Sequence, residues 1–149
     1  MEPHGLQHQR ILTEGWLIRS SREIRARGED VSRLGFDTGG WLPASVPSTV
    51  LGAWVENGRC DNPYIGMNLR AMPREVFQSP WWYRREFLLS EAEARKTVLL
   101  EFHGINYAAN IWLNGHPVTA AKEARGAFRR FQYDISRMVA GGGGTPDPT

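Results

Sequence analysis

The sequence predicts an antiparallel, all-β domain with one short helix. Residues 81–89 alternate between a more apolar and a more polar face and are rich in aromatic side chains, which is typical of a strand. Residues 97–103 and 108–113 repeat this alternation. Asn114-Gly115 follows directly and supplies the positive φ angles of a type I′ hairpin, so a return strand is expected from Pro117-Val118.

The N-terminal half predicts one strand and one helix. Residues 11–19 form the first strand, and residues 20–40 are expected to be a surface excursion such as a ragged hairpin. Residues 41–47 are extended, because a residue that precedes proline avoids the helical region. Ser48 is the expected N-cap of a helix through residue 57, and Gly58 ends it. Trp54 lies on the apolar stripe of this helix, which favours packing over ligand contact.

The central loop, residues 59–69, reads RCDNPYIGMNL. Asp61-Asn62-Pro63 starts a turn, and Gly66 relaxes the backbone between two bulky apolar residues. Pro73 is expected to begin one helical turn through residue 77. Because loops carry binding groups more often than the elements that they join, this loop is the first candidate for function.

The C-terminal half predicts two further strands and then a tail. Residues 90–96 are a polar turn, residues 119–126 a charged connection, and residues 127–133 a strand, after which Ser136 caps one turn through Val139. Residues 140–149 read AGGGGTPDPT and offer nothing that a core can bury, so the last strand of a sandwich is expected to be missing. The predicted organisation is a loose tail over residues 1–10, a β-sandwich over 11–140 and a disordered tail over 141–149.

Composition excludes several classes of partner. A chain of 149 residues suits one domain that buries roughly 68–70% of its unfolded surface. The net charge is +2 and the arginines are spread among acidic residues, so a nucleic-acid partner is not expected. Cys60 is the single cysteine, so no intrachain disulfide forms. No signal-peptide core and no apolar run of about 18 residues is present, so we expect no membrane partner and, by default, a cytoplasmic location.

No catalytic, metal or cofactor site is predicted on this chain. Acid/base and nucleophilic catalysis by paired carboxylates needs two of them close together, and nothing in the sequence places two of the candidates together. No phosphate loop, dinucleotide fingerprint, zinc spacing or nucleophile elbow is found. His103 and His116 are expected to be surface or hydrogen-bonded structural groups. The candidate carboxylates are Glu75, Glu86, Glu101 and Asp134.

Three blocks, PWWYRREF, GINYAANIWLNG and ASVPSTVLGAWVENGRCDNPYIGMNL, resemble the N-terminal sugar-binding domain of family 2 glycoside hydrolases, most of all the β-mannosidase and exo-β-glucosaminidase branch. The resemblance covers residues 15–136. It implies a galactose-binding-like jelly roll of about eight strands that walls one side of an active-site pocket, with the catalytic carboxylates on a downstream (β/α)₈ barrel of about 250 residues. The chain departs from the family after residue 136, where members carry Gly-Asn and a further apolar strand.

The resemblance directs the site prediction to the central loop and the strand at residue 81. Sugar sites combine aromatic platforms with polar groups at the rim, and the alternative is that the polar residues make a turn while the aromatic ones pack in the core. The predicted substrate-binding residues are Asp61, Asn62, Tyr64, Asn68, Trp81 and Trp82.

Of three functions, the first below is the predicted one and the other two are its alternatives. The first is a non-catalytic sugar-binding module, present as a fragment, of a family 2 glycosidase that acts on a β-linked sugar or oligosaccharide; its protein partner is the downstream barrel. The second is a stand-alone carbohydrate-binding protein. The third is a structural or partner-docking β-sandwich without a ligand.

Overall fold

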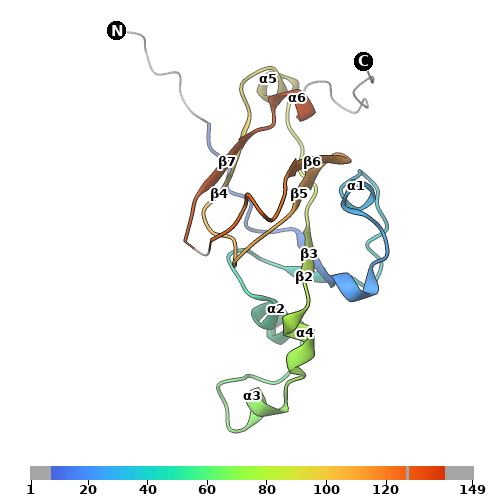
Figure 1. The fold of residues 1–149 in the computed structure, drawn as a ribbon, viewed down its shortest axis with the longest axis vertical. Helices are drawn as coiled ribbons and strands as arrows, with labels where there is room; N and C mark the ends of the chain where they lie inside the picture. Colours follow the sequence, from blue (N-terminus) through green and yellow to red (C-terminus); the bar gives the residue numbers. More distant parts are fainter. Residues whose placement is uncertain (1–7, 127, 140–149) are drawn as a thin grey trace. The chain divides into compact units, whose positions relative to one another are not determined.

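The computed structural model describes residues 8–126 and 128–139, which contain seven strands and several short helices (Figure 1). Every ladder between these strands is antiparallel, so the predicted all-β antiparallel class is confirmed. The described residues form two compact units. The first comprises the described residues up to Arg25 together with Thr38–Arg85, and the second comprises Ala26–Asp37 and the described residues from Glu86 onward.

A three-stranded sheet in the order β2-β1-β3 forms the first unit. β1 (Trp16–Ser20) lies in the centre, between β2 (Leu42–Ala44) and β3 (Trp81–Arg84). Ile18 of β1 is fully buried and forms the centre of the core with Ala44. The other members of this core are Ala53 and the partly buried Trp16, Leu42 and Trp81.

Two strands of this sheet are shorter than the alternation in the sequence predicts. β1 begins at Trp16, because Gly15 directly before it takes a φ of +79°, outside the extended region. The ladder between β1 and β3 ends where Leu17 pairs with Arg84. β3 therefore stops at Arg84 instead of continuing to residue 89, because its antiparallel partner β1 begins at Trp16, directly before Leu17.

The helix α2 (Val50–Glu56) confirms the predicted helix but not its cap. The hydroxyl of Thr49, not Ser48, accepts a hydrogen bond from the backbone N–H of Gly52 at 3.0 Å. Trp54 of α2 packs edge-on against Phe77, with ring centroids 5.4 Å apart, as expected for a packing residue. The other helices of this unit are η1 (Ser21–Glu23), α3 (Asn68–Ala71) and α4 (Arg74–Gln78), the last of which confirms the helical turn predicted to begin at Pro73.

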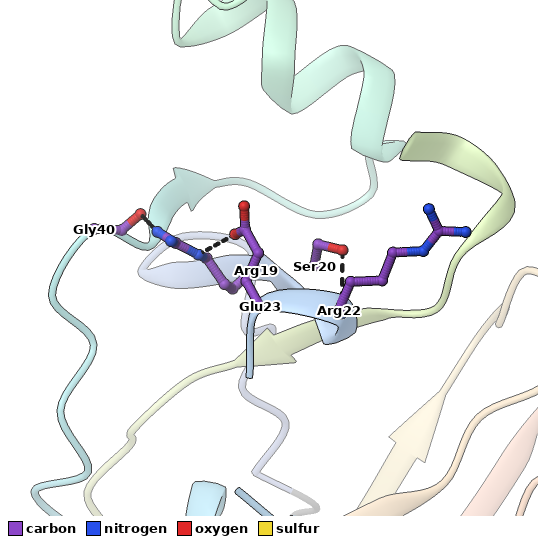
Figure 2. A network of polar contacts seen from close by, with 5 residues as sticks. All are labelled: Arg19, Ser20, Arg22, Glu23 and Gly40. Carbon is purple, nitrogen blue, oxygen red and sulfur yellow. Dashed lines mark hydrogen bonds and ion pairs between the residues drawn. The ribbon is translucent and has the colours of Figure 1, made fainter. Parts of the chain in front are cut away.

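A polar network at the end of β1 explains why the expected hairpin over residues 20–40 is wrong (Figure 2). The guanidinium of Arg19 donates to the carbonyl of Gly40 and pairs with Glu23. The hydroxyl of Ser20 accepts a hydrogen bond from the backbone N–H of Arg22 at 3.4 Å. The chain therefore turns into η1 directly after β1, and no strand follows before β2 in the described residues.

Two antiparallel ladders form the second unit. Asn114 and Gly115 join one pair of strands with φ angles of +51° and +86°, so the predicted Asn-Gly hairpin is confirmed. The ladders are β4 (Leu99–Phe102) with β7 (Phe131–Asp134), and β5 (Ile111–Leu113) with β6 (His116–Thr119).

Three short helices accompany these ladders: α1 (Gly28–Val31), α5 (Glu91–Ala94) and α6 (Ser136–Val139). The segment predicted as a polar turn holds α5, because Ser90 and Glu93 form a capping box. The N–H of Glu93 donates to the Ser90 hydroxyl at 3.2 Å, and the N–H of Ser90 donates to the Glu93 carboxylate at 2.7 Å. The predicted disordered C-terminal tail and the missing last strand lie outside the described residues, as does most of the predicted N-terminal tail.

Candidate functional site

Four of the six predicted site residues lie on one arm, defined here as residues 58–73 between α2 and α4. Figure 1 shows that α3 lies at the far end of this arm, beyond α2 and α4. Gly58 takes a φ of +65° and so ends α2, as the sequence predicts, and the arm leaves the helix at that point. The predicted site residues on the arm are Asp61, Asn62, Tyr64 and Asn68.

Hydrogen bonds within the arm centre on Asn62. Its side-chain Oδ1 accepts from the backbone N–H of Tyr64 at 3.0 Å, which closes the predicted turn. Its backbone carbonyl accepts from the side-chain Nδ2 of Asn68 at 2.9 Å and from the N–H of Ile65 at 3.2 Å. Gly66 takes a φ of +57°, as the sequence led us to expect. Asn62 and Asn68 therefore brace the arm itself.

The braced arm presents apolar side chains to solvent. Tyr64 is 94% exposed, so it does not pack in the core. Ile65 and Met67 are each 63% exposed and Leu69 is 60% exposed, although the sequence analysis did not single them out. The sequence does indicate their exposure, because these bulky apolar residues alternate with Gly66 and Asn68 inside a loop that has no core-facing periodicity.

The other two predicted site residues lie on β3. Trp81 packs against the core, and its ring meets that of Trp54 edge-on at 6.2 Å. The indole N–H of Trp81 donates to the carbonyl of Val76 at 2.8 Å. Trp82 is half-buried and pairs with Arg19 in the ladder. For Trp81 the structure therefore shows packing, whereas the four residues on the arm are brought together.

Three of the candidate carboxylates bond to neighbours in the second unit. Glu86 accepts a hydrogen bond from the backbone N–H of Gly35 at 3.2 Å. Glu101 lies 3.1 Å from Nε2 of His103 and 3.8 Å from the guanidinium of Arg130. His103 is thus a structural partner, as predicted.

The structure shifts the titration of Asp134 clearly. Its Oδ1 accepts from the hydroxyl of Ser136 at 2.5 Å and from the backbone N–H of Ser136 at 2.9 Å. These hydrogen bonds, the hydroxyl one first, favour the charged form and hold the pKa of Asp134 below its ordinary value. The Ser136 hydroxyl in turn accepts from the N–H of Val98 at 2.8 Å, so the carboxylate organises the start of α6.

Within residues 8–126 and 128–139, no group of three or more His, Cys, Asp or Glu side chains has an arrangement that could hold a metal ion. Across the same part of the chain, the structure has no helix with the length and apolar character needed to cross a bilayer.

Comparison with known proteins identifies the relatives of this domain. Residues 16–145 match the family described as glycosyl hydrolase 2 galactose-binding domain-like. The exo-β-D-glucosaminidase of Streptomyces avermitilis is 33% identical over 131 residues, which is 88% of this chain and 14% of that protein. The mannosylglycoprotein endo-β-mannosidase of Lilium longiflorum is 30% identical over 139 residues, again 88% of this chain and 14% of the relative.

A solved structure has the same fold. The exo-chitosanase CsxA of Amycolatopsis orientalis superposes with a TM-score of 0.79 at 31% identity, over 85% of this chain and 15% of that one. The antiparallel strands and this superposition define the class as a galactose-binding-like β-sandwich. The chain belongs to the galactose-binding-like domain family of glycosyl hydrolase family 2. The resemblance to its exo-β-glucosaminidase and β-mannosidase branch is thereby confirmed.

Proposed function

We propose that this domain is a non-catalytic sugar-binding module of a family 2 glycoside hydrolase, and that its arm lines part of the active-site pocket of a catalytic (β/α)₈ barrel. The observation that carries the proposal is the braced arm, which holds Tyr64 almost fully exposed three residues from the exposed carboxylate of Asp61. An aromatic ring offers a flat apolar platform and a carboxylate accepts hydrogen bonds from hydroxyls, which is the combination that a pyranose requires.

The proposed ligand is a β-linked sugar or oligosaccharide. The relatives support this class, because their names describe enzymes that act on β-linked glucosamine and mannose units. The chain spans about one seventh of the length of these relatives, so the barrel is a proposed partner. Asn62 and Asn68 act in this proposal as positioning residues, since their side chains bond to the arm.

The test is steady-state kinetics of the complete enzyme that carries this domain, with Asp61→Ala and Tyr64→Ala made separately. Each change is expected to lower kcat/KM by about tenfold, equivalent to about 1.4 kcal/mol of transition-state stabilisation, with an unchanged melting temperature. Glu75→Ala is the matched control, because Glu75 is an exposed carboxylate on α4. Unchanged kinetics in both arm variants, with an intact fold, would contradict the assignment of the arm.

A second function, docking to protein, is favoured by Ile65, Met67 and Leu69. Three exposed apolar side chains in one short arm are typical of a surface that another protein covers. In this alternative the arm packs against the barrel and does not touch the sugar. Ile65→Ser with Leu69→Ser would then lower the melting temperature of the complete enzyme and leave that of the isolated 149-residue chain unchanged.

A further inference from the structure

An arginine-rich surface of the second unit uses none of the arm's residues. We call it the guanidinium surface and define it as Tyr107, Arg125, Phe128, Arg129 and Arg130. All five side chains are exposed; that of Phe128 is 100% exposed and that of Tyr107 59%. Three arginines within six residues, beside two exposed aromatic rings, need a physical explanation.

Two of these guanidinium groups lie over aromatic rings. That of Arg125 lies 4.8 Å from the ring centroid of Tyr107, and its Nη2 donates to the Tyr107 hydroxyl at 2.6 Å. That of Arg129 lies 5.4 Å from the ring centroid of Phe131, and its Nη1 donates to the backbone carbonyl of Arg125 at 3.3 Å. A guanidinium carries five N–H donors, and each of these two hydrogen bonds uses one. Stacking orients the planar groups and leaves further donors for a ligand.

The backbone holds Tyr107 in a conformation that bulky residues rarely adopt. Its φ is +74°, in the left-handed region that favours glycine. The N–H of Gly126 donates to the Tyr107 carbonyl at 2.7 Å, and Ala108 forms a β-bridge with Arg125. The surrounding structure thus maintains a strained residue that brings its ring to Arg125, and such strain concentrates at functional sites.

The nearby carboxylates are engaged elsewhere or are too few to neutralise the surface. Glu101 faces Arg130 at 3.8 Å but also pairs with His103. Glu123 accepts a hydrogen bond from the hydroxyl of Thr119 at 3.2 Å. The guanidinium surface therefore carries excess positive charge, and it complements an anion.

We propose that the guanidinium surface binds the anionic group of an acidic saccharide, a carboxylate or a sulfate, between Arg125 and Arg129. The ring of Phe128 then stacks on the apolar face of a neighbouring pyranose. An acidic peptide fits less well, because an aromatic anchor at a protein interface needs apolar neighbours that exclude water, and Phe128 is 100% exposed and followed by Arg129 and Arg130.

The test is calorimetric titration of the 149-residue chain with tetragalacturonate, and with a sulfated tetrasaccharide in parallel. A neutral mannotetraose has no anionic group, so its binding to the arm should not respond to changes in the guanidinium surface. Binding of at least one of the two anionic sugars to the guanidinium surface is expected. Arg125→Gln with Arg129→Gln should weaken that binding at least tenfold. Arg95→Gln is the matched control, because Arg95 lies in the same unit, is exposed and uses its side chain in a 3.6 Å ion pair with Glu91, so its removal should leave binding unchanged.

Phe128→Ala keeps the proposal testable if the arginine variant fails to fold, because a fully exposed side chain adds nothing to the core. It should weaken binding several-fold. Failure of both anionic sugars to bind would overturn the proposal, as would equal losses in Arg95→Gln and the double variant. Binding of poly-glutamate without binding of either sugar would also overturn it, in favour of an acidic peptide partner.

Discussion

Gly28 and the indole ring of Trp112 are in direct contact in the second unit. A Cβ atom at position 28 would lie 2.1 Å from Cε2 and 2.2 Å from Cδ2 of Trp112, far inside van der Waals contact. Gly28 is buried at the start of α1, and Trp112 lies on β5. The absence of a side chain at this position thus allows the helix and the hairpin to approach each other.

Gly28→Ala is therefore expected to destabilise the chain by about 1–3 kcal/mol, because the added methyl overpacks the contact with the ring. Urea denaturation at fixed pH measures this loss. Trp112→Leu in the same background should relieve the clash, so the double variant should lose clearly less than the sum of the single losses. Strictly additive losses would show that the two residues do not constrain each other.

The hydrogen bonds from Ser136 to Asp134 predict a loss of stability in acid. Because the pKa of Asp134 in the folded chain lies below its ordinary value of 3.8, its contribution is fully present above that value. The contribution disappears as the pH falls through the lowered pKa, where the carboxylate takes up a proton in the folded state too. Denaturation midpoints measured across this acidic range should therefore fall more steeply in the wild type than in Asp134→Asn.

Asp134→Asn retains an acceptor oxygen for Ser136 but has no charge to titrate. If the variant and the wild type lose stability in parallel as the pH falls, the titration of Asp134 does not contribute to the loss of stability in acid. The exposed Glu91 provides a control, because Glu91→Gln also removes one carboxylate near a helix start, and that carboxylate faces Arg95 at 3.6 Å and not Ser136.

The two asparagines of the arm predict opposite outcomes for the same substitution. Asn62 accepts through Oδ1, and Asp retains an acceptor there, so Asn62→Asp should keep the amide of Tyr64 protected from hydrogen exchange. Asn68 donates through Nδ2, and a carboxylate cannot donate, so Asn68→Asp should loosen the arm. Loss of one such bond, worth about 1 kcal/mol, should raise exchange of the arm amides roughly fivefold.

Hydrogen exchange measured residue by residue by NMR distinguishes a bracing role of Asn62 and Asn68 from a direct role in sugar contact. Asn62→Ala is the matched variant, because it lacks the acceptor and should expose the Tyr64 amide that Asn62→Asp protects. Equal exchange in both Asn→Asp variants would mean that the side chains do not brace the arm.

Local chemistry explains what the sequence predicted well. Period-two alternation marked the strand at Trp81, and Asn114-Gly115 specified the hairpin, because both signals depend only on near neighbours. The backbone freedom of Gly66 in the arm was likewise predicted from near neighbours, and Gly66 takes a positive φ. The three family blocks also depend on sequence alone, and the comparisons confirm the family.

Long-range pairing decided what the sequence did not. β3 ends at Arg84 because its partner β1 begins next to Leu17, which lies opposite Arg84 and more than sixty positions away in the sequence. The cap of α2 is a local exception: Ser48 and Thr49 are both residue types that cap helices, and the backbone directs the Thr49 hydroxyl at the N–H of Gly52.

Tertiary packing also separates the predicted site residues into packed and exposed ones. Trp81 and Tyr64 are both aromatic and both suited to stack on a sugar, so the sequence alone could not separate them. Tertiary packing partly buries Trp81 against the ring of Trp54 and leaves Tyr64 in solvent on the arm. Residue type thus determined which side chains are able to bind a sugar, and the fold decided which of them are presented, because exposure depends on the packing of distant segments.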